Sequence, residues 1–301
     1  MAEQDGKIWF GTARKAQWVK APLADMGASG NGFSEEQQFN NGGQFVNASF
    51  GSARNFDMSW MGDRSELQVI KDYKDGIYGG GLIYWEDPFA KNILPPHWAA
   101  PMLSVRDWPS LIQSGNKPEP VMFPSADNGY PYQGAKYTVT NTEETSRSAT
   151  LLIPEGHELG VGFVWTATGT AKLWCAPILT DGTEDTHIEL TQVLDSGTSR
   201  VVDYFSNTSS ATTRYIAVRI YIARTDSTPS TITIHGGMAI LNPTEAPHPH
   251  PAFTNSDPWS SGEGFSGCVI STVPSMSYKG LVDGRRLINM SANLKEIGAW
   301  L

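Results

Sequence analysis

The chain has 301 residues, a length typical of about two domains, each large enough to bury a core without disulfide or metal support. Its formal net charge is −9 and it contains no run of Lys or Arg, which excludes electrostatic binding to nucleic-acid backbones. Charged residues make up 18% of the chain, and 30 Gly, 19 Pro and 10 Trp indicate many turns and much aromatic packing, as in a mainly β protein.

The first sixty residues combine short aromatic segments with one strictly alternating strand. Between residues 55 and 60, Phe56, Met58 and Trp60 alternate with polar side chains. This period of two is typical of a strand with one buried face and one solvated face. The block contains no candidate catalytic group, so we expect it to serve packing.

One amphipathic helix follows this strand. Asp63 is a suitable N-cap, Leu67, Ile70 and Tyr73 recur at helical spacing, and Gly76 supplies a stop signal. A glycine run and a short apolar strand at 82–85 come next. The segment 92–124 is rich in Pro and Trp, and we expect it to be an extended, packed loop, because disordered segments are poor in aromatic residues.

A series of strand patterns separated by turn clusters occupies the middle of the chain. The predicted strands are 137–140, 149–153, 159–165, 172–179, 187–194, 214–223 and 231–240. Many short strands without intervening helices predict a β-sandwich of jelly-roll type. Trp165 alternates in phase with Val161 and Phe163 and is expected in its core.

The domain organisation follows from the proline-rich segment after this sandwich. Residues 242–251 form a stiff connector, and strand patterns return at 268–273 and 287–300. The last fifty residues are too few for an independent core, so we expect them to complete the N-terminal domain. The prediction is a base domain of one short helix and β-sandwich-like sheets (1–124 and 252–301), a linker at 125–136, an inserted sandwich at 137–241 and a linker at 242–251.

The two cysteines and the N-terminus bear on compartment. Cys175 lies in an apolar strand pattern and is expected to be a buried free thiol rather than half of a disulfide with Cys268. The N-terminus lacks the apolar region of a signal peptide, and no window is long enough for a transmembrane helix. We expect a soluble protein made in a cytoplasm.

Candidate chemistry is sparse. Four residues of metal-binding or acid–base type lie close in sequence: Asp181, Asp185, His187 and Glu189. Turn solvation and a polar strand face explain them equally, and a proline-rich linker explains His248 and His250. No nucleophile elbow, P-loop or dinucleotide-binding glycine pattern is present. We therefore expect no catalytic residues, no metal, no cofactor and no enzymatic activity.

A better candidate is the outer face of the sandwich. Strand alternation directs five side chains outward, which would lie together if their strands adjoin: Trp174, Tyr215, Arg219, Tyr221 and His235. Aromatic side chains with polar neighbours suit a carbohydrate or a protein contact. The alternative is that this face packs against the base domain or a neighbouring subunit.

Both ends of the chain resemble a known family. The segments that carry the resemblance are Lys7-Ile8-Trp9-Phe10-Gly11, Gln17-Trp18-Val19, Phe39-Asn40-Asn41-Gly42-Gly43, Phe56-Asp57-Met58-Ser59-Trp60, Gly262 to Cys268, and Ser291 to Trp300. Over roughly the first 110 and last 40 residues the sequence is similar to minor tail proteins of long-tailed, siphovirus-type phages, particularly those infecting actinobacteria.

The resemblance implies a distal tail protein of the virion, made in the host cytoplasm. Such proteins form a ring, usually sixfold, that joins the tail tube to the tip and the host-attachment apparatus. The implied partners are other copies of the chain, the tail tube protein, other tip proteins and a host cell-wall glycan, with no nucleic acid and no membrane. A galectin-like or carbohydrate-binding-module-like sandwich would project from the ring. The alternative function is a carbohydrate-binding adhesin that acts through 137–241.

Overall fold

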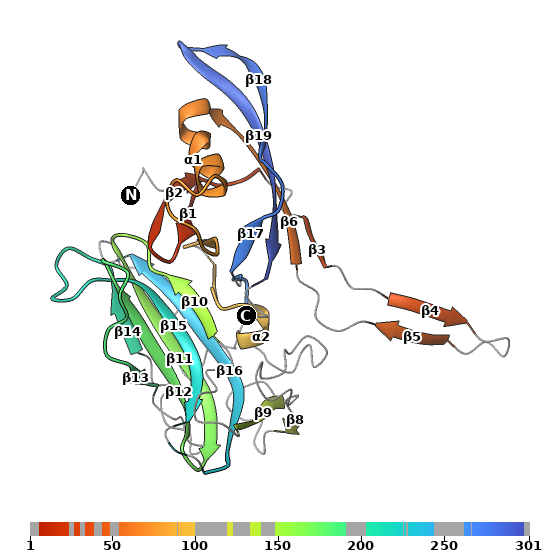
Figure 1. Ribbon diagram of the computed structural model, residues 1–301, viewed down its shortest axis with the longest axis vertical. Helices are drawn as coiled ribbons and strands as arrows, with labels where there is room; N and C mark the ends of the chain where they lie inside the picture. The colour runs from red at the N-terminus through yellow and green to blue at the C-terminus, as the bar shows by residue number, and fades with distance from the viewer. Residues whose placement is uncertain are drawn as a thin grey trace.

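The computed structural model shows a mainly β chain of two parts, a base domain and a β-sandwich (Figure 1). It describes residues 6–23, 27–30, 34–38, 44–48, 54–88, 90–99, 119–122, 133–139, 148–190, 203–224, 226, 228–243, 262–265 and 267–297. The fold class predicted from the sequence is therefore confirmed. No helix in these ranges is both long and apolar enough to cross a membrane.

The two ends of the chain meet in one sheet of the base domain. Its order is β17 (Cys268–Ile270), β19 (Arg285–Glu296), β6 (Arg54–Asp63) and β3 (Gly27–Gly30), and β18 (Ser275–Val282) also pairs with β19. Strands β6 and β19 are antiparallel and pair from Asn55–Lys295 to Asp63–Leu287. The last long strand of the chain thus completes the sheet begun by β6.

The alternation predicted for β6 is confirmed. Phe56, Met58 and Trp60 are at most 2% exposed, whereas Asp57 is exposed on the opposite face. Across the ladder, Trp60 lies opposite Met290, which is also buried. The buried row of β6 therefore packs in one core with the buried row of β19.

A smaller sheet and a helix close this core. The sheet has the order β2 (Lys15–Lys20), β1 (Lys7–Thr12) and β7 (Tyr84–Glu86), and the helix α1 spans Arg64–Lys74. Asp63 caps α1 by accepting the Ser65 N–H at 2.8 Å, and Leu67, Ile70 and Tyr73 are buried, as predicted. The Trp60 indole N–H donates to the carbonyl of Lys20 at 3.0 Å, which ties the two sheets together.

The sandwich consists of two antiparallel sheets. One sheet has the order β10 (Ser148–Leu152), β15 (Tyr215–Arg224), β12 (Ala171–Leu179) and β13 (Ile188–Glu189). The other has the order β14 (Asp203–Ser206), β11 (His157–Thr168), β16 (Ser230–Pro243), β9 (Gln133–Val139) and β8 (Glu119–Met122). Trp165 is 1% exposed in the core between them, as predicted.

Three features differ from the sequence-based expectations. Residues 96–99 form a short helix, α2 (Pro96–Ala99), within the segment expected to be extended, and proline is well suited to the first helical position. Strand β8 joins the sandwich sheet although 119–122 was assigned to the base domain. A hairpin of β4 (Ser34–Gln38) and β5 (Gln44–Ala48) was not anticipated, and Figure 1 shows it projecting away from the base sheet. The remaining domain boundaries stay predictions.

The segment 90–99 docks the base domain onto the sandwich. The Asn92 side chain donates to the carbonyl of Gly237 and accepts the N–H of Ala239, both at 3.0 Å. On its other side, the N–H of Gly264 donates to the carbonyl of Leu94 at 3.0 Å. A Cβ on Gly264 would lie 1.7 Å from the Ile93 carbonyl oxygen, so only glycine fits this approach. The segment therefore bridges the C-terminal return and the sandwich.

A buried carboxyl group lies at the same junction. Glu86 of β7 is 2% exposed and accepts the backbone N–H of Leu152 from β10 at 3.0 Å. Beside it, Trp9, Leu152, Ile178 and Ala217 form a small apolar cluster that joins the base domain to the sandwich. Burial raises the pKa of Glu86 well above 4.5, because water no longer solvates the carboxylate.

This pKa shift predicts a pH-dependent stability. The folded chain binds the Glu86 proton more tightly than the unfolded chain, so the contribution of Glu86 to the free energy of unfolding is fully present below pH 4.5 and falls as the pH rises toward the folded-state pKa. We expect Glu86→Gln to reduce this fall and to raise stability at pH 7, measured by urea unfolding between pH 4 and 8. The exposed Glu263→Gln is the control, and an unchanged pH slope in Glu86→Gln would contradict the assignment.

Candidate functional site

Three of the five predicted face residues lie together on the outer surface of the β10–β15–β12–β13 sheet. Trp174 of β12 is directly opposite Tyr221 of β15, and Ala176 is opposite Arg219. The residues that alternate with them along the two strands are fully buried in the sandwich core: Leu173, Cys175, Val218 and Ile220. Because successive side chains of a strand point to opposite faces, Trp174, Arg219 and Tyr221 point away from that core. Trp174, Arg219 and Tyr221 therefore form one cluster, as predicted.

Tyr215 does not belong to this cluster. The register of β12 and β15 shifts between Ile178 and Leu179, so Ile216 is an extra residue and Tyr215 pairs with Leu179. A β-bulge of this kind inverts the alternation beyond it. Tyr215 consequently packs against the sandwich core, with its ring 6.1 Å from that of Phe205, while Ile216 turns outward to the junction cluster. The predicted outward orientation of Tyr215 is therefore wrong.

His235 is also misplaced by the sequence-based prediction. It lies on β16, which belongs to the opposite sheet of the sandwich, and it is 4% exposed. The register between β11 and β16 shifts at this point: Val164 pairs with Gly236 and Trp165 with Ile234, so His235 is the bulged residue. Alternation alone gave the phase of a strand, but it could not show which sheet the strand joins.

A polar segment covers the outer cluster. Glu184 forms an ion pair with Arg219, His187 lies 3.4 Å from Glu184, and the Tyr221 hydroxyl lies 2.6 Å from His187 Nδ1. These contacts extend from the edge of the sheet across β12 to β15. Ala176, between them on the same face, is only 1% exposed. The face therefore carries a polar network in which the side chains of Glu184, Arg219 and His187 are 37%, 43% and 48% exposed, whereas Tyr221 is only 7% exposed.

The acidic residues considered for a metal have separate partners. Asp181 accepts from Thr183 within its own turn, Asp185 accepts the Tyr215 hydroxyl at 3.0 Å, and Glu189 pairs with Lys172 at 2.6 Å. Within the described ranges, no group of three or more His, Cys, Asp or Glu side chains is arranged to hold a metal ion. His248 and His250 lie outside the described residues.

A cavity of about 330 Å³ separates this network from the base domain. Its lining combines Leu82 and Tyr84 of the base domain with Thr150, Glu184, His187, Arg219 and Tyr221 of the sandwich. Burial raises the pKa values of Tyr84 and Tyr221, so both hydroxyls stay protonated at neutral pH and can donate hydrogen bonds. The face predicted for ligand contact thus faces β7 of the same chain.

The cysteines are structural. Neither Cys175 nor Cys268 forms a disulfide, and both are fully buried, the first in the sandwich core and the second in the base core. Burial raises the pKa of each thiol, which disfavours the reactive thiolate. The predicted free thiol at Cys175 is confirmed.

Comparison with known proteins gives no family. No protein-family model and no curated protein matches the sequence. Among solved structures, one described as "CBM4 structure and function" aligns with 43% of this chain and 86% of its own at 11% identity and a TM-score of 0.21. The Gx strain of infectious bursal disease virus and T=1 particles derived from that virus each align with 97% of this chain, and with 80% and 77% of theirs, at 11% identity and a TM-score of 0.25. These TM-scores are too low to indicate a function for this chain.

Proposed function

We propose that the chain is a structural virion protein of a phage tail tip, and that its base domain assembles with other copies into a ring joining the tail tube to the tip. The resemblance of the two chain ends to distal tail proteins supports this proposal. The same two ends build one sheet through the β6–β19 ladder. Described parts of both ends that carry the resemblance thus pair with each other in one sheet.

The observation that carries the proposal is the exposed β18–β19 hairpin. Tyr278, Leu281 and Val282 are 61%, 65% and 54% exposed, although large apolar side chains are normally buried. Figure 1 shows this hairpin extending past α1, away from the rest of the chain. An exposed apolar hairpin with an unpaired edge is a typical site of association.

The surroundings of the hairpin favour a second copy of the chain as its partner. A groove of about 540 Å³ runs along it, lined by Arg64, Met276, Tyr278, Leu281, Arg286 and Ile288. The groove therefore has apolar walls and a cationic rim, whereas the whole chain carries a net charge of −9. A cationic patch on an acidic chain is complementary to a different surface of another copy. A head-to-tail contact of this type generates a ring when the rotation between successive copies closes.

The base-domain aromatics contribute less to this interface than expected. Phe10, Phe56, Trp60 and Trp85 are at most 2% exposed and already packed within the chain's own core. A ring built by the base domain would be expected to bury outward aromatic side chains of this domain between subunits. In the described part of the chain, the hairpin residue Tyr278 is the aromatic side chain that best fits this role.

Sedimentation velocity tests the proposal. We expect the wild-type chain to sediment as a closed oligomer at micromolar concentration, and Leu281→Asp to shift it to monomer, because a carboxylate cannot be buried in the apolar groove without a large penalty. Val273→Asp is the matched control, since Val273 is 68% exposed but does not line the groove. A monomeric wild type, or a Leu281→Asp variant that assembles normally, would contradict the proposal.

Carbohydrate binding through the sandwich stays a prediction. An adhesin of this kind needs aromatic faces open to the sugar. Here Tyr221 is 7% exposed, and Arg219 is already paired with Glu184. The geometry of the chain favours the structural role over this alternative.

A further inference from the structure

We propose that a second cavity, between the β1–β2 turn and the sandwich, binds a phosphate-type oxyanion. This cavity has a volume of about 180 Å³. The residues that define its chemistry are Trp9, Arg14, Lys15, Glu155, Asn207 and Arg214. They come from four places in the sequence and include residues of both the base domain and the sandwich.

The cavity has an excess of positive charge. Arg14 and Lys15 in the β1–β2 turn have exposed side chains with no acidic partner among the described residues. Arg214 faces them from the start of β15, and Glu155 is the acidic side chain of the lining. Three cations thus surround one carboxylate in a chain whose net charge is −9.

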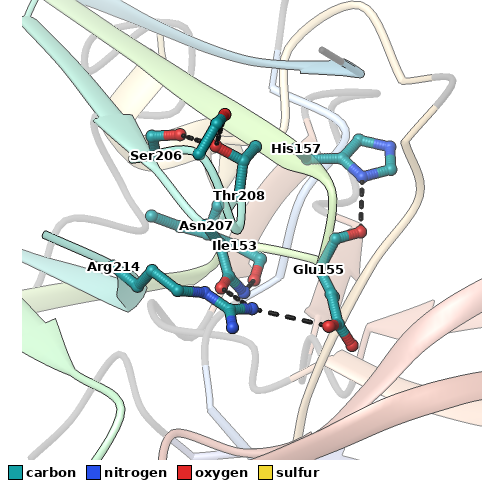
Figure 2. A network of polar contacts seen from close by, with 8 residues as sticks. Ile153, Glu155, His157, Ser206, Asn207, Thr208 and Arg214 are labelled. Atoms are coloured by element: carbon teal, nitrogen blue, oxygen red, sulfur yellow. Dashed lines mark hydrogen bonds and ion pairs between the residues drawn. The ribbon is translucent and has the colours of Figure 1, made fainter. Parts of the chain in front are cut away.

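Arg214 is held in place by a buried amide. Asn207 is 3% exposed, donates from Nδ2 to the carbonyl of Ile153 at 2.7 Å, and accepts from Arg214 Nη2 at 3.1 Å. Figure 2 shows the guanidinium between Asn207 and Glu155, which it reaches at the long distance of 3.5 Å. The amide fixes the guanidinium, whereas the contact with Glu155 is weak because Glu155 is 72% exposed.

Two buried donors in this lining have no acceptor. The Nε of Arg214 and the indole Nε1 of Trp9 are both buried without a hydrogen-bond partner within the described ranges. Trp9 itself is 8% exposed. A buried donor without an acceptor costs roughly 1–3 kcal/mol. Because less than 1 Å² of either atom is accessible, a group in the cavity would reach these two donors only after a local shift of side chains, and the donors directly available to it are those of Arg14, Lys15 and the outer nitrogens of Arg214.

A phosphate group matches this set of donors. It presents several acceptor oxygens around one centre and carries negative charge, and guanidinium groups bind such oxygens with charge-assisted hydrogen bonds. The donors approach from the β1–β2 turn on one side and from the sandwich on the other. A bound phosphate would therefore connect the base domain to the sandwich, in addition to the assembly role proposed above.

The test is calorimetric titration of the full chain with sodium phosphate, with sodium chloride of equal ionic strength as the reference. We expect saturable phosphate binding that Arg14→Gln and Arg214→Gln each weaken at least about tenfold, since each removes one charged hydrogen-bond donor. Glu155→Gln should tighten binding, because it removes the opposing charge. Lys91→Gln, an exposed lysine outside the lining, should bind as the wild type does.

The outcomes are distinct. Arg14 makes no hydrogen bond to another described side chain, so Arg14→Gln is expected to fold normally. This variant therefore still tests the proposal if Arg214→Gln does not fold.

A parallel titration with glycerol 3-phosphate identifies the source of the group. Stronger binding than inorganic phosphate indicates a phosphoryl group on a larger molecule, and weaker binding indicates the free ion. Absence of phosphate binding, or equal binding by wild type and Arg14→Gln, would overturn the proposal.

Discussion

Replacing Trp60 with alanine is expected to lower the free energy of unfolding of the base domain by about 3–5 kcal/mol. The side chain is 1% exposed in the core shared by β6 and β19, so its removal leaves a large cavity. The change also removes the indole donor to the carbonyl of Lys20, which leaves that acceptor without its partner. Urea unfolding followed by circular dichroism measures the loss.

Met61→Ala is the matched control for this prediction. Met61 is the next residue of the same strand, but its side chain is on the other face and is 43% exposed. We expect its replacement to change stability by less than about 1 kcal/mol, as for most surface positions. Equal effects of the two substitutions would show that β6 does not pack as described.

The ion pair between Arg54 and Glu296 is expected to have the second large effect. The guanidinium donates through Nε at 2.7 Å and Nη2 at 2.8 Å to the two carboxylate oxygens of Glu296, and Nη2 also donates to the carbonyl of Gly264. The Glu296 side chain is only 5% exposed. Glu296→Ala leaves the guanidinium without its counter-charge, at a cost of about 3–5 kcal/mol. The pair links residues 242 positions apart, so its loss weakens the closure of the base domain.

An exposed ion pair of the chain provides the comparison. Lys172 and Glu189 are 38% and 40% exposed, and Glu189→Ala should cost less than about 1 kcal/mol, since solvent screens surface pairs. Unfolding of both alanine variants in urea gives the two values. If Glu296→Ala cost no more than Glu189→Ala, the Arg54–Glu296 pair would not hold the two chain ends together.

The spacing of apolar residues predicted the strands and helices of this fold well where that spacing stays constant along a whole segment. The alternation of Phe56, Met58 and Trp60 and the helical spacing of Leu67, Ile70 and Tyr73 both matched the observed burial. In these segments, one face packs against a core and the other is solvated. The period of the sequence is then sufficient to assign each side chain to a face.

The candidate site was less predictable because its geometry depends on irregularities and on pairing between distant strands. The bulges at Ile216 and His235 each add one residue to a strand, which shifts all later side chains to the opposite face. No residue type marks the bulge at Ile216, whereas Gly236 and Gly237 directly after His235 are residues that often accompany a bulge within a strand. The cavity at Arg14 and Arg214 was not found from the sequence because its residues are 200 positions apart. The Arg14-Lys15 turn between two aromatic strands was the one available signal.

Electron cryo-microscopy of the purified full-length oligomer tests the central claim most directly. We expect a closed ring in which the β18–β19 hairpin of each copy inserts its apolar side chains against the base domain of the next copy, with the sandwiches on the periphery. A particle in which Tyr278 and Leu281 remain exposed in every copy, or in which the sandwiches alone mediate contact between copies, would contradict it.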